Sequence, residues 1–167
     1  GRQAGHRGVL VVASGDVPAN RVTQRLGAIE IRESLGQIQR AGVDGADIER
    51  IYMGCVLPAG LGQAPARQAS IGAGVGYHVP CTTVNKVCAS GMKAVMLAAQ
   101  SIMLGINDVV VAGGMESMSN VPYYVPKARF GYKYGNGELI DGLAKDGLVD
   151  VYDQIAMGNY ADRTAVK

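Results

Sequence analysis

The sequence of 167 residues contains no tryptophan and one phenylalanine, so a folded core must be built from aliphatic side chains. Charged residues make up 18% of the chain, and the formal net charge is only +2. Such a small charge gives no reason to expect nucleic-acid binding. The hydrophobic fraction of 48% is ordinary for a globular protein and excludes a disordered tail.

Several other features are scarce. No apolar run approaches the roughly 20 residues that a membrane helix requires, and no segment is typical of a secretory signal. The three cysteines, Cys55, Cys81 and Cys88, form no CxxC pair, and the histidines, His6 and His78, lie far from ligand-like spacings. We therefore expect no metal site, no disulfide framework and a reducing compartment.

Glycine, in contrast, is abundant, with 24 residues, which indicates tight turns and close backbone approaches. Short β-branched runs alternate with helical periodicity. We expect strands at 9–12, 51–56, 82–84 and 109–112, and helices at 26–39, 65–73 and 92–104. A turn is expected at Gly15–Pro18, and the fourth strand should end at Gly113-Gly114. The alternation predicts an α/β fold with a largely parallel, buried sheet.

The composition changes at about Ser119. From there to Lys145 the chain has no apolar stripe and mixes tyrosines with basic residues. Such interleaving occurs in proteins that bind single-stranded nucleic acid. The acidic residues that follow would repel a phosphate backbone, so we expect no nucleic-acid partner; they are Glu138, Asp141, Asp146 and Asp150. A last helix is predicted over 151–165, interrupted by Gly158.

Cys88 is the sharpest chemical feature, because it follows a predicted strand and opens a predicted helix. The partial positive charge and the unpaired N–H groups of a helix N-terminus favour a thiolate. The same N–H groups can hold an oxyanion that develops on a thioester carbonyl. The alternative is an inert buried cysteine, as most free cysteines are. Cys55 and Cys81 lie in or beside apolar strands, and we predict that both are core residues.

Several segments carry a resemblance to a known family. Residues 84–94 (VNKVCASGMKA) resemble the nucleophile signature of the thiolase family, in its acetoacetyl-CoA branch. Residues 113–119 (GGMESMS) resemble the segment that closes the family's N-terminal half-domain. The loop at 54–68 also fits the family pattern, and 145–148 and 157–158 resemble the loop domain that covers coenzyme A.

The resemblance implies a thiolase-like α/β fold, in which two βαβαβαββ halves stack around buried helices and a loop domain is added. Residues 1–118 would form the N-terminal half-domain, and 119–167 would begin the loop domain, whereas the C-terminal half is absent. A sheet separated from its second half should expose a large apolar patch.

The resemblance also implies a reaction. The family condenses two acetyl-CoA into acetoacetyl-CoA and CoA, or runs the reverse thiolysis, with Cys88 as the acyl-accepting nucleophile and its backbone N–H as an oxyanion donor. Coenzyme A belongs to the substrate, so no separate cofactor is expected. Leu148 and Met157 would contact the pantetheine arm, with plain packing as the alternative. Many relatives have histidine where this chain has Ala156.

The family is oligomeric, so we expect a homodimer or homotetramer and no membrane partner. The segment from Ser119 to Lys145, called the excursion below, holds basic residues that would make tetramer contacts or form a solvated face; they are Lys127, Arg129 and Lys133. Relatives occur in the cytoplasm and in the mitochondrial matrix, and the sequence leaves both open.

Three groups of the family pattern belong to the C-terminal half: a Gly-His-Pro histidine, a Cys-x-Gly cysteine and an asparagine that positions water. His78 does not lie in a Gly-His-Pro motif, and we predict that it is a loop or surface residue. The sequence stops at Lys167, so this chain alone is expected to be acylated slowly at most. The first strand also departs from the family's Arg-Thr-Pro-x-Gly loop.

Two alternatives remain open. One is a broader-range 3-ketoacyl-CoA thiolase of fatty-acid degradation. The other is a non-catalytic chain that pairs with longer subunits as an interaction module.

Overall fold

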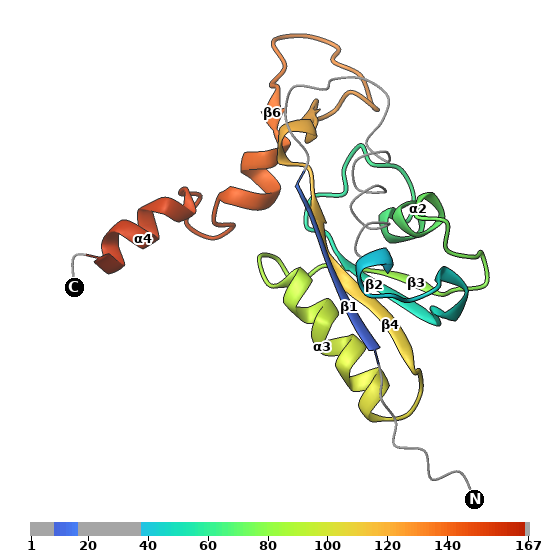
Figure 1. Ribbon diagram of the computed structural model, residues 1–167. Helices are drawn as coiled ribbons and strands as arrows, with labels where there is room; N and C mark the ends of the chain where they lie inside the picture. The colour runs from blue at the N-terminus through green and yellow to red at the C-terminus, as the bar shows by residue number, and fades with distance from the viewer. Residues whose placement is uncertain (1–8, 17–37, 166–167) are drawn as a thin grey trace, which may run out of the picture. The chain divides into compact units, whose positions relative to one another are not determined.

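The computed structural model describes residues 9–16, by their backbone, and residues 38–165 (Figure 1). The chain forms two compact units, Gly1–Ser117 and Met118–Lys167. A helix was predicted over 26–39, and most of it lies outside the described residues. The part that is described, residues 38–40, is helical.

The first unit is built on a four-stranded parallel sheet. Its strands are β1 (Val9–Asp16), β2 (Arg50–Gly54), β3 (Cys81–Val84) and β4 (Val109–Glu116). Their order in the sheet is β1-β4-β2-β3, and every paired neighbour is parallel. The predicted α/β fold with a parallel sheet is therefore confirmed.

Strand β2 ends at Gly54, two residues before the predicted end, and two other strands are longer than predicted. Strand β1 continues through Gly15 and Asp16, where a turn was expected, and β4 continues past Gly113-Gly114 to Glu116. The two strands pair residue by residue from Val9↔Val109 to Asp16↔Glu116. This ladder of backbone hydrogen bonds overrides the weak strand propensity of glycine.

Helices cover both faces of the sheet, as a buried parallel sheet requires (Figure 1). Helix α2 (Pro65–Gly72) begins with a proline, which a first helical turn tolerates. Its buried alanines join a core that includes Ile51, Met53 and Val111. Helix α3 (Ser90–Met103) packs on the other face, against Val110 and Ala112.

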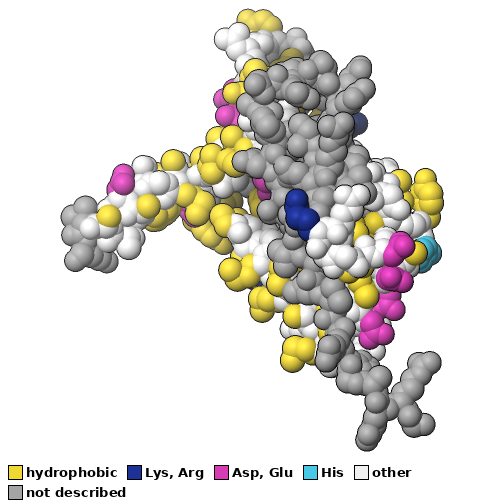
Figure 2. All heavy atoms as spheres, in the orientation of Figure 1, with side chains coloured by type: hydrophobic (Ala, Val, Ile, Leu, Met, Phe, Trp, Pro, Cys, Tyr) yellow, Lys and Arg dark blue, Asp and Glu magenta, His cyan; other side chains and the backbone are white. Residues whose placement is uncertain are grey.

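Helix α3 buries small side chains and exposes large ones. Its fully buried residues are Ala94 and Ala98. Alanine lets the helix axis come close to the sheet, so the contact falls on the small residues. The exposed fractions of Met92, Met96 and Met103 are 69%, 49% and 84%. Figure 2 shows the resulting hydrophobic surface, which agrees with the apolar patch expected of a separate half.

The second unit has little regular structure. Strand β5 (Tyr123–Tyr124) pairs antiparallel with β6 (Ile140–Asp141), and a helical turn, η3 (Ala144–Leu148), precedes α4 (Met157–Ala165). The prediction that the last helix starts at 151 is wrong. The Asp150 carboxylate accepts the N–H groups of Tyr152 and Asp153, at 2.9 and 2.6 Å, and this turn delays the helix. No helix within 9–16 and 38–165 is long and apolar enough to cross a membrane.

One contact in the second unit gives a pH prediction. The Tyr160 hydroxyl donates a hydrogen bond to Asp153, and this bond raises the pKa of Tyr160 from 10.0 to about 12. Only the neutral phenol donates, so the contact should be complete below pH 10 and lost as the pH rises through about 12. In the complete protein, Asp153→Ala should return the Tyr160 titration toward 10, measured by tyrosinate absorbance against a Tyr160→Phe reference. Identical titration curves with and without Asp153 would contradict the assignment.

Candidate active site

Cys88 lies in the short turn that joins β3 to α3. The thiol is free and exposed, whereas Cys55 is buried. The predicted place of Cys88, between a strand and a helix, is confirmed, and so is the core position of Cys55. Cys81 packs against the core, as predicted, but it begins the edge strand β3 and is only partly buried.

The turn before Cys88 has an unusual backbone. Val87 has φ +49°, a left-handed conformation that costs energy for a β-branched residue. The Ser90 hydroxyl accepts the Lys86 N–H at 2.8 Å and donates to the Val87 carbonyl at 2.5 Å. The Ser90 N–H reaches the same carbonyl at 3.0 Å. Hydrogen bonds on both sides of Val87 therefore hold the conformation that presents Cys88.

The start of α3 rests directly on the backbone of the sheet. A Cβ atom added at Gly54, the last residue of β2, would lie 2.5 Å from the Ser90 carbonyl carbon and closer still to the Gly91 nitrogen. At Gly91 and Gly114 an added Cβ would lie 3.7 and 3.4 Å from the facing Cα atom. Three glycines thus bring α3, β2 and β4 into backbone contact immediately beside Cys88.

The N-terminus of α3 can receive a negative charge. The residue before the helix, Ala89, provides no side-chain cap. The first N–H groups of a helix have no partner within the helix, and its dipole places partial positive charge there. An oxyanion that develops beside Cys88 would be stabilised by both effects.

Two polar side chains near this turn were missed by the sequence analysis. The Asn85 amide contacts the backbone of Val87 and of Val56, and the Glu116 carboxylate accepts N–H groups of the loop that follows β2. An asparagine two residues before a left-handed residue is a recognisable turn signal. The contacts of Glu116 join segments some 60 residues apart in sequence, and no local pattern reveals them.

His78 is exposed in the turn that precedes β3, as predicted. Cys88 follows the other end of the same strand, so the two residues flank opposite ends of β3 and His78 is not placed to activate the thiol. Among the described residues, no group of three or more histidine, cysteine or acidic side chains could hold a metal ion.

Leu148 and Met157 both lie next to a backbone bridge in the second unit. Val149 and Ala156 form an isolated antiparallel bridge, and Leu148 and Met157 are each one residue away from it, at the end of η3 and the start of α4. Their exposed fractions are 43% and 48%. The basic residues of the excursion are also exposed, in the segment between β5 and β6; they are Lys127, Arg129 and Lys133. Their predicted roles in coenzyme A binding and in tetramer contacts stay predictions.

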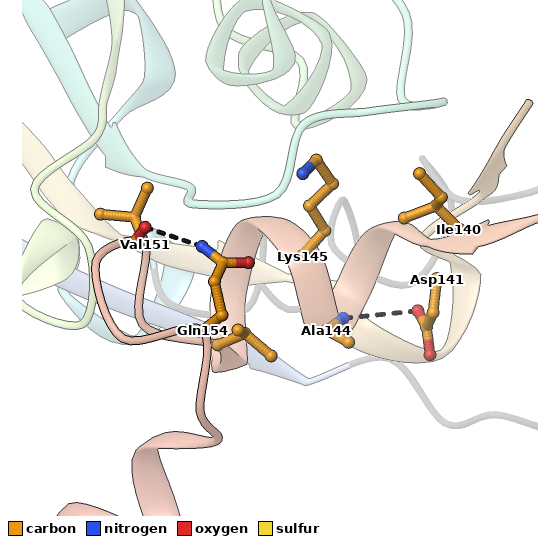
Figure 3. Close-up of a pocket in the computed structure, with 7 residues that line it drawn as sticks. Ile140, Asp141, Ala144, Lys145, Val151 and Gln154 are labelled. Atoms are coloured by element: carbon orange, nitrogen blue, oxygen red, sulfur yellow. Dashed lines mark hydrogen bonds between the residues drawn. The ribbon is translucent and has the colours of Figure 1, made fainter. Parts of the chain in front are cut away.

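A small cavity of about 270 Å³ lies next to this bridge, between η3 and the turn before α4 (Figure 3). Its polar groups are engaged locally: Asp141 accepts the Ala144 N–H at 3.4 Å, and the Gln154 amide donates to the Val151 carbonyl at 2.7 Å. The Lys145 side chain also lines it. The volume is below that of typical ligand pockets, and we assign no ligand to it.

Comparisons with known proteins agree with this geometry. Residues 10–167 match the N-terminal domain of the thiolase family. Acetyl-CoA acetyltransferase 1 of Arabidopsis thaliana is 61% identical over 134 residues, which are 80% of this chain and 32% of the relative. The mitochondrial acetyl-CoA acetyltransferase of Rattus norvegicus is 54% identical over 149 residues, 89% of this chain and 34% of the relative.

A solved structure of Acat5 thiolase from Ascaris suum, in complex with coenzyme A, superposes with a TM-score of 0.79 at 38% identity. The match covers 93% of this chain and 39% of that protein. This chain spans about a third of the length of the curated relatives it matches. From the domain match, the relatives and the nucleophile turn together, the chain belongs to the thiolase family, in the region of its N-terminal domain.

Proposed function

We propose that this chain is the N-terminal part of an acetyl-CoA C-acetyltransferase, in which Cys88 carries the acyl group. The observation that supports this most directly is the exposed Cys88 thiol at the uncapped start of α3. Relatives at 53–61% identity are named acetyl-CoA acetyltransferases. The chain contributes the nucleophile and a helix N-terminus that stabilises anions.

The first half-reaction forms the acyl-enzyme. The Cys88 thiolate attacks the thioester carbonyl of acetyl-CoA, and the negative charge moves onto the carbonyl oxygen. The Cys88 N–H and the neighbouring start of α3 would stabilise that oxyanion. The C–S bond to coenzyme A then breaks, and CoA leaves as a thiol after taking up a proton.

The second half-reaction forms the carbon–carbon bond. A second acetyl-CoA loses a proton from its methyl carbon, and the carbanion attacks the acetyl group on Cys88. The bond to the Cys88 sulfur breaks, which releases acetoacetyl-CoA and restores the thiolate. The family supplies the bases for both proton transfers, a histidine and a second cysteine, from its C-terminal half, so the complete reaction is assigned to the whole protein.

In the second unit, Leu148 and Met157 would offer an apolar contact to the pantetheine arm of coenzyme A. Their half-exposed side chains on either side of the Val149↔Ala156 bridge support this role. The double variant Leu148→Ala/Met157→Ala should raise KM for acetyl-CoA by about tenfold with little change in kcat, because two apolar side chains leave a binding surface. An unchanged KM in steady-state thiolysis would assign both residues to packing.

We also propose that the protein forms a homo-oligomer and that the exposed part of the excursion between β5 and β6 makes the contacts between subunits. The proposed compartment is the cytoplasm or the mitochondrial matrix, and relatives named as mitochondrial are among the matches.

The proposal is tested by locating the acyl group. The complete protein is mixed with acetyl-CoA, quenched in acid and digested, and its peptides are weighed. One acetyl group is expected on the peptide that contains Cys88 and none on those that contain Cys55 or Cys81. A protein that binds acetyl-CoA without this label would be the non-catalytic alternative. Equal thiolysis of long and short 3-ketoacyl-CoA would replace the acetoacetyl assignment by the broad-range one.

A further inference from the structure

The side chain of Asn85 joins two loops at the nucleophile turn. Its carbonyl oxygen accepts the Val87 N–H at 3.0 Å, and its amide donates to the Val56 carbonyl at 3.2 Å. The first bond lies within the turn that leads to Cys88. The second reaches the loop after β2, 29 residues earlier in the sequence.

Glu116 holds that same loop from the other side. Its carboxylate accepts the Val56 N–H at 2.8 Å and the Leu57 N–H at 2.9 Å, and the Cys55 thiol lies 3.6 Å from one oxygen. Both polar groups of Val56 are therefore bound, the N–H by Glu116 and the carbonyl by Asn85. The two bonds to the Glu116 carboxylate are charge-assisted and therefore stronger than a neutral bond such as that of Asn85.

These contacts form a continuous path from the end of β4 to Cys88. Glu116, at the last position of β4, fixes the peptide groups of Val56, and Val56 in turn orients the Asn85 amide. Asn85 then binds the N–H of Val87, whose φ of +49° sets the direction of the chain into Cys88. A valine keeps that conformation only where its surroundings hold it.

We propose that Asn85 and Glu116 act together as positioning residues that aim the Cys88 thiol and its N–H, without touching the substrate themselves. This proposal rests on the proposed role of Cys88. A displacement of about 1 Å at a reacting group costs on the order of 100-fold in rate, so loss of the Asn85 contacts should reduce acylation between tenfold and 100-fold. Binding of coenzyme A should change little.

The experiment uses variants of the complete protein. Asn85→Ala removes both contacts. Asn85→Ser keeps an acceptor for the Val87 N–H, as serine does in similar turns, but is too short to reach Val56. Glu116→Gln leaves one acceptor for two N–H groups.

The matched control is Asn107→Ala. The Asn107 side chain accepts bonds from Arg50 at 3.1 Å and Ser101 at 2.6 Å, beyond the opposite end of α3, a helix about 20 Å long.

Four quantities are measured for each variant: kcat and KM of thiolysis, the alkylation rate of Cys88 by iodoacetamide, and the thermal midpoint. We expect both Asn85 variants and Glu116→Gln to lower kcat at least tenfold with KM within twofold, and to change the alkylation rate. Asn107→Ala should lower the thermal midpoint by a similar amount and leave kcat and alkylation unchanged. The double variant Asn85→Ala/Glu116→Gln should be no slower than the slower single variant, because the two residues act through one path.

Several results would overturn the proposal. Asn85→Ser with wild-type kcat would show that only the local turn matters. Additive losses in the double variant would show that the two residues act independently. An equal effect of Asn107→Ala would reduce the contacts to general stability. Failure of the proposed function gives a different result, namely a wild-type protein that is not acetylated. The alkylation rates of Cys88 would then still report whether Asn85 and Glu116 set its environment.

Discussion

Replacement of Cys88 by serine is expected to lower the thiolysis rate of the complete protein about 10,000-fold or more, because loss of the nucleophile abolishes the covalent route. The exposed thiol at the uncapped start of α3 is the proposed acyl acceptor. A serine hydroxyl is hardly ionised at neutral pH and is a much weaker nucleophile toward a thioester. The measurement is the steady-state cleavage of acetoacetyl-CoA, together with the thermal midpoint.

The chain supplies its own control for this experiment. Cys81 lies in the same unit, is also a free thiol and is only partly buried, so Cys81→Ser makes the same chemical change away from the turn. We expect it to retain nearly the wild-type rate. A Cys88→Ser protein that is folded and within tenfold of wild type would remove Cys88 from the mechanism.

Substitution of Gly54 by alanine is expected to have the second largest effect. The added Cβ would lie 2.5 Å from the Ser90 carbonyl carbon, a distance that only a shift of α3 away from β2 can relieve. Overpacking of this kind costs about 1–3 kcal/mol of stability. Cys88 moves with the start of α3, so kcat should fall on the order of 100-fold. Urea unfolding and thiolysis kinetics on the same preparation measure both effects.

Alanine substitutions at two other glycines of the first unit should have smaller effects than Gly54→Ala. An alanine at Gly114 would place its Cβ 3.4 Å from the Gly91 Cα, and one at Gly45 would meet Gly74 O at 3.8 Å. Gly114→Ala should therefore cost less than Gly54→Ala, and Gly45→Ala should be close to neutral. Equal activity of all three variants would mean that the contact between α3 and β2 yields freely and does not locate Cys88.

The nucleophile turn could be predicted from the sequence because its signals are local. A β-branched run, a small-residue turn and a run of helix formers place Cys88 between β3 and α3. The parallel sheet followed from the same alternation. The ends of β1 and β4 could not be predicted, because their pairing with each other, and not their own composition, extends them to Asp16 and Glu116.

The contacts that hold the nucleophile turn in place could not be predicted from the sequence. Glu116 in a glycine-rich segment gives no sign that it binds a loop 60 residues earlier. The burial of Ala94 and Ala98 at the centre of the α3 contact depends on the backbone proximity at Gly91 and Gly114, which sets the depth of the helix on the sheet. Long-range contacts of this kind are properties of the folded chain and not of a local pattern.

The contact of Gly54, Gly91 and Gly114 through bare backbone has a consequence for how such a protein can change over generations. Main-chain atoms, which no substitution alters, fix the location of the nucleophile. Loop side chains other than the positioning contacts of Asn85 and Ser90 can therefore vary, and with them the substrates that the site admits, without moving the reacting atom. Chemistry and selectivity become separable traits, and a library directed at the loops should yield altered substrate preferences far more often than one directed at the three glycines.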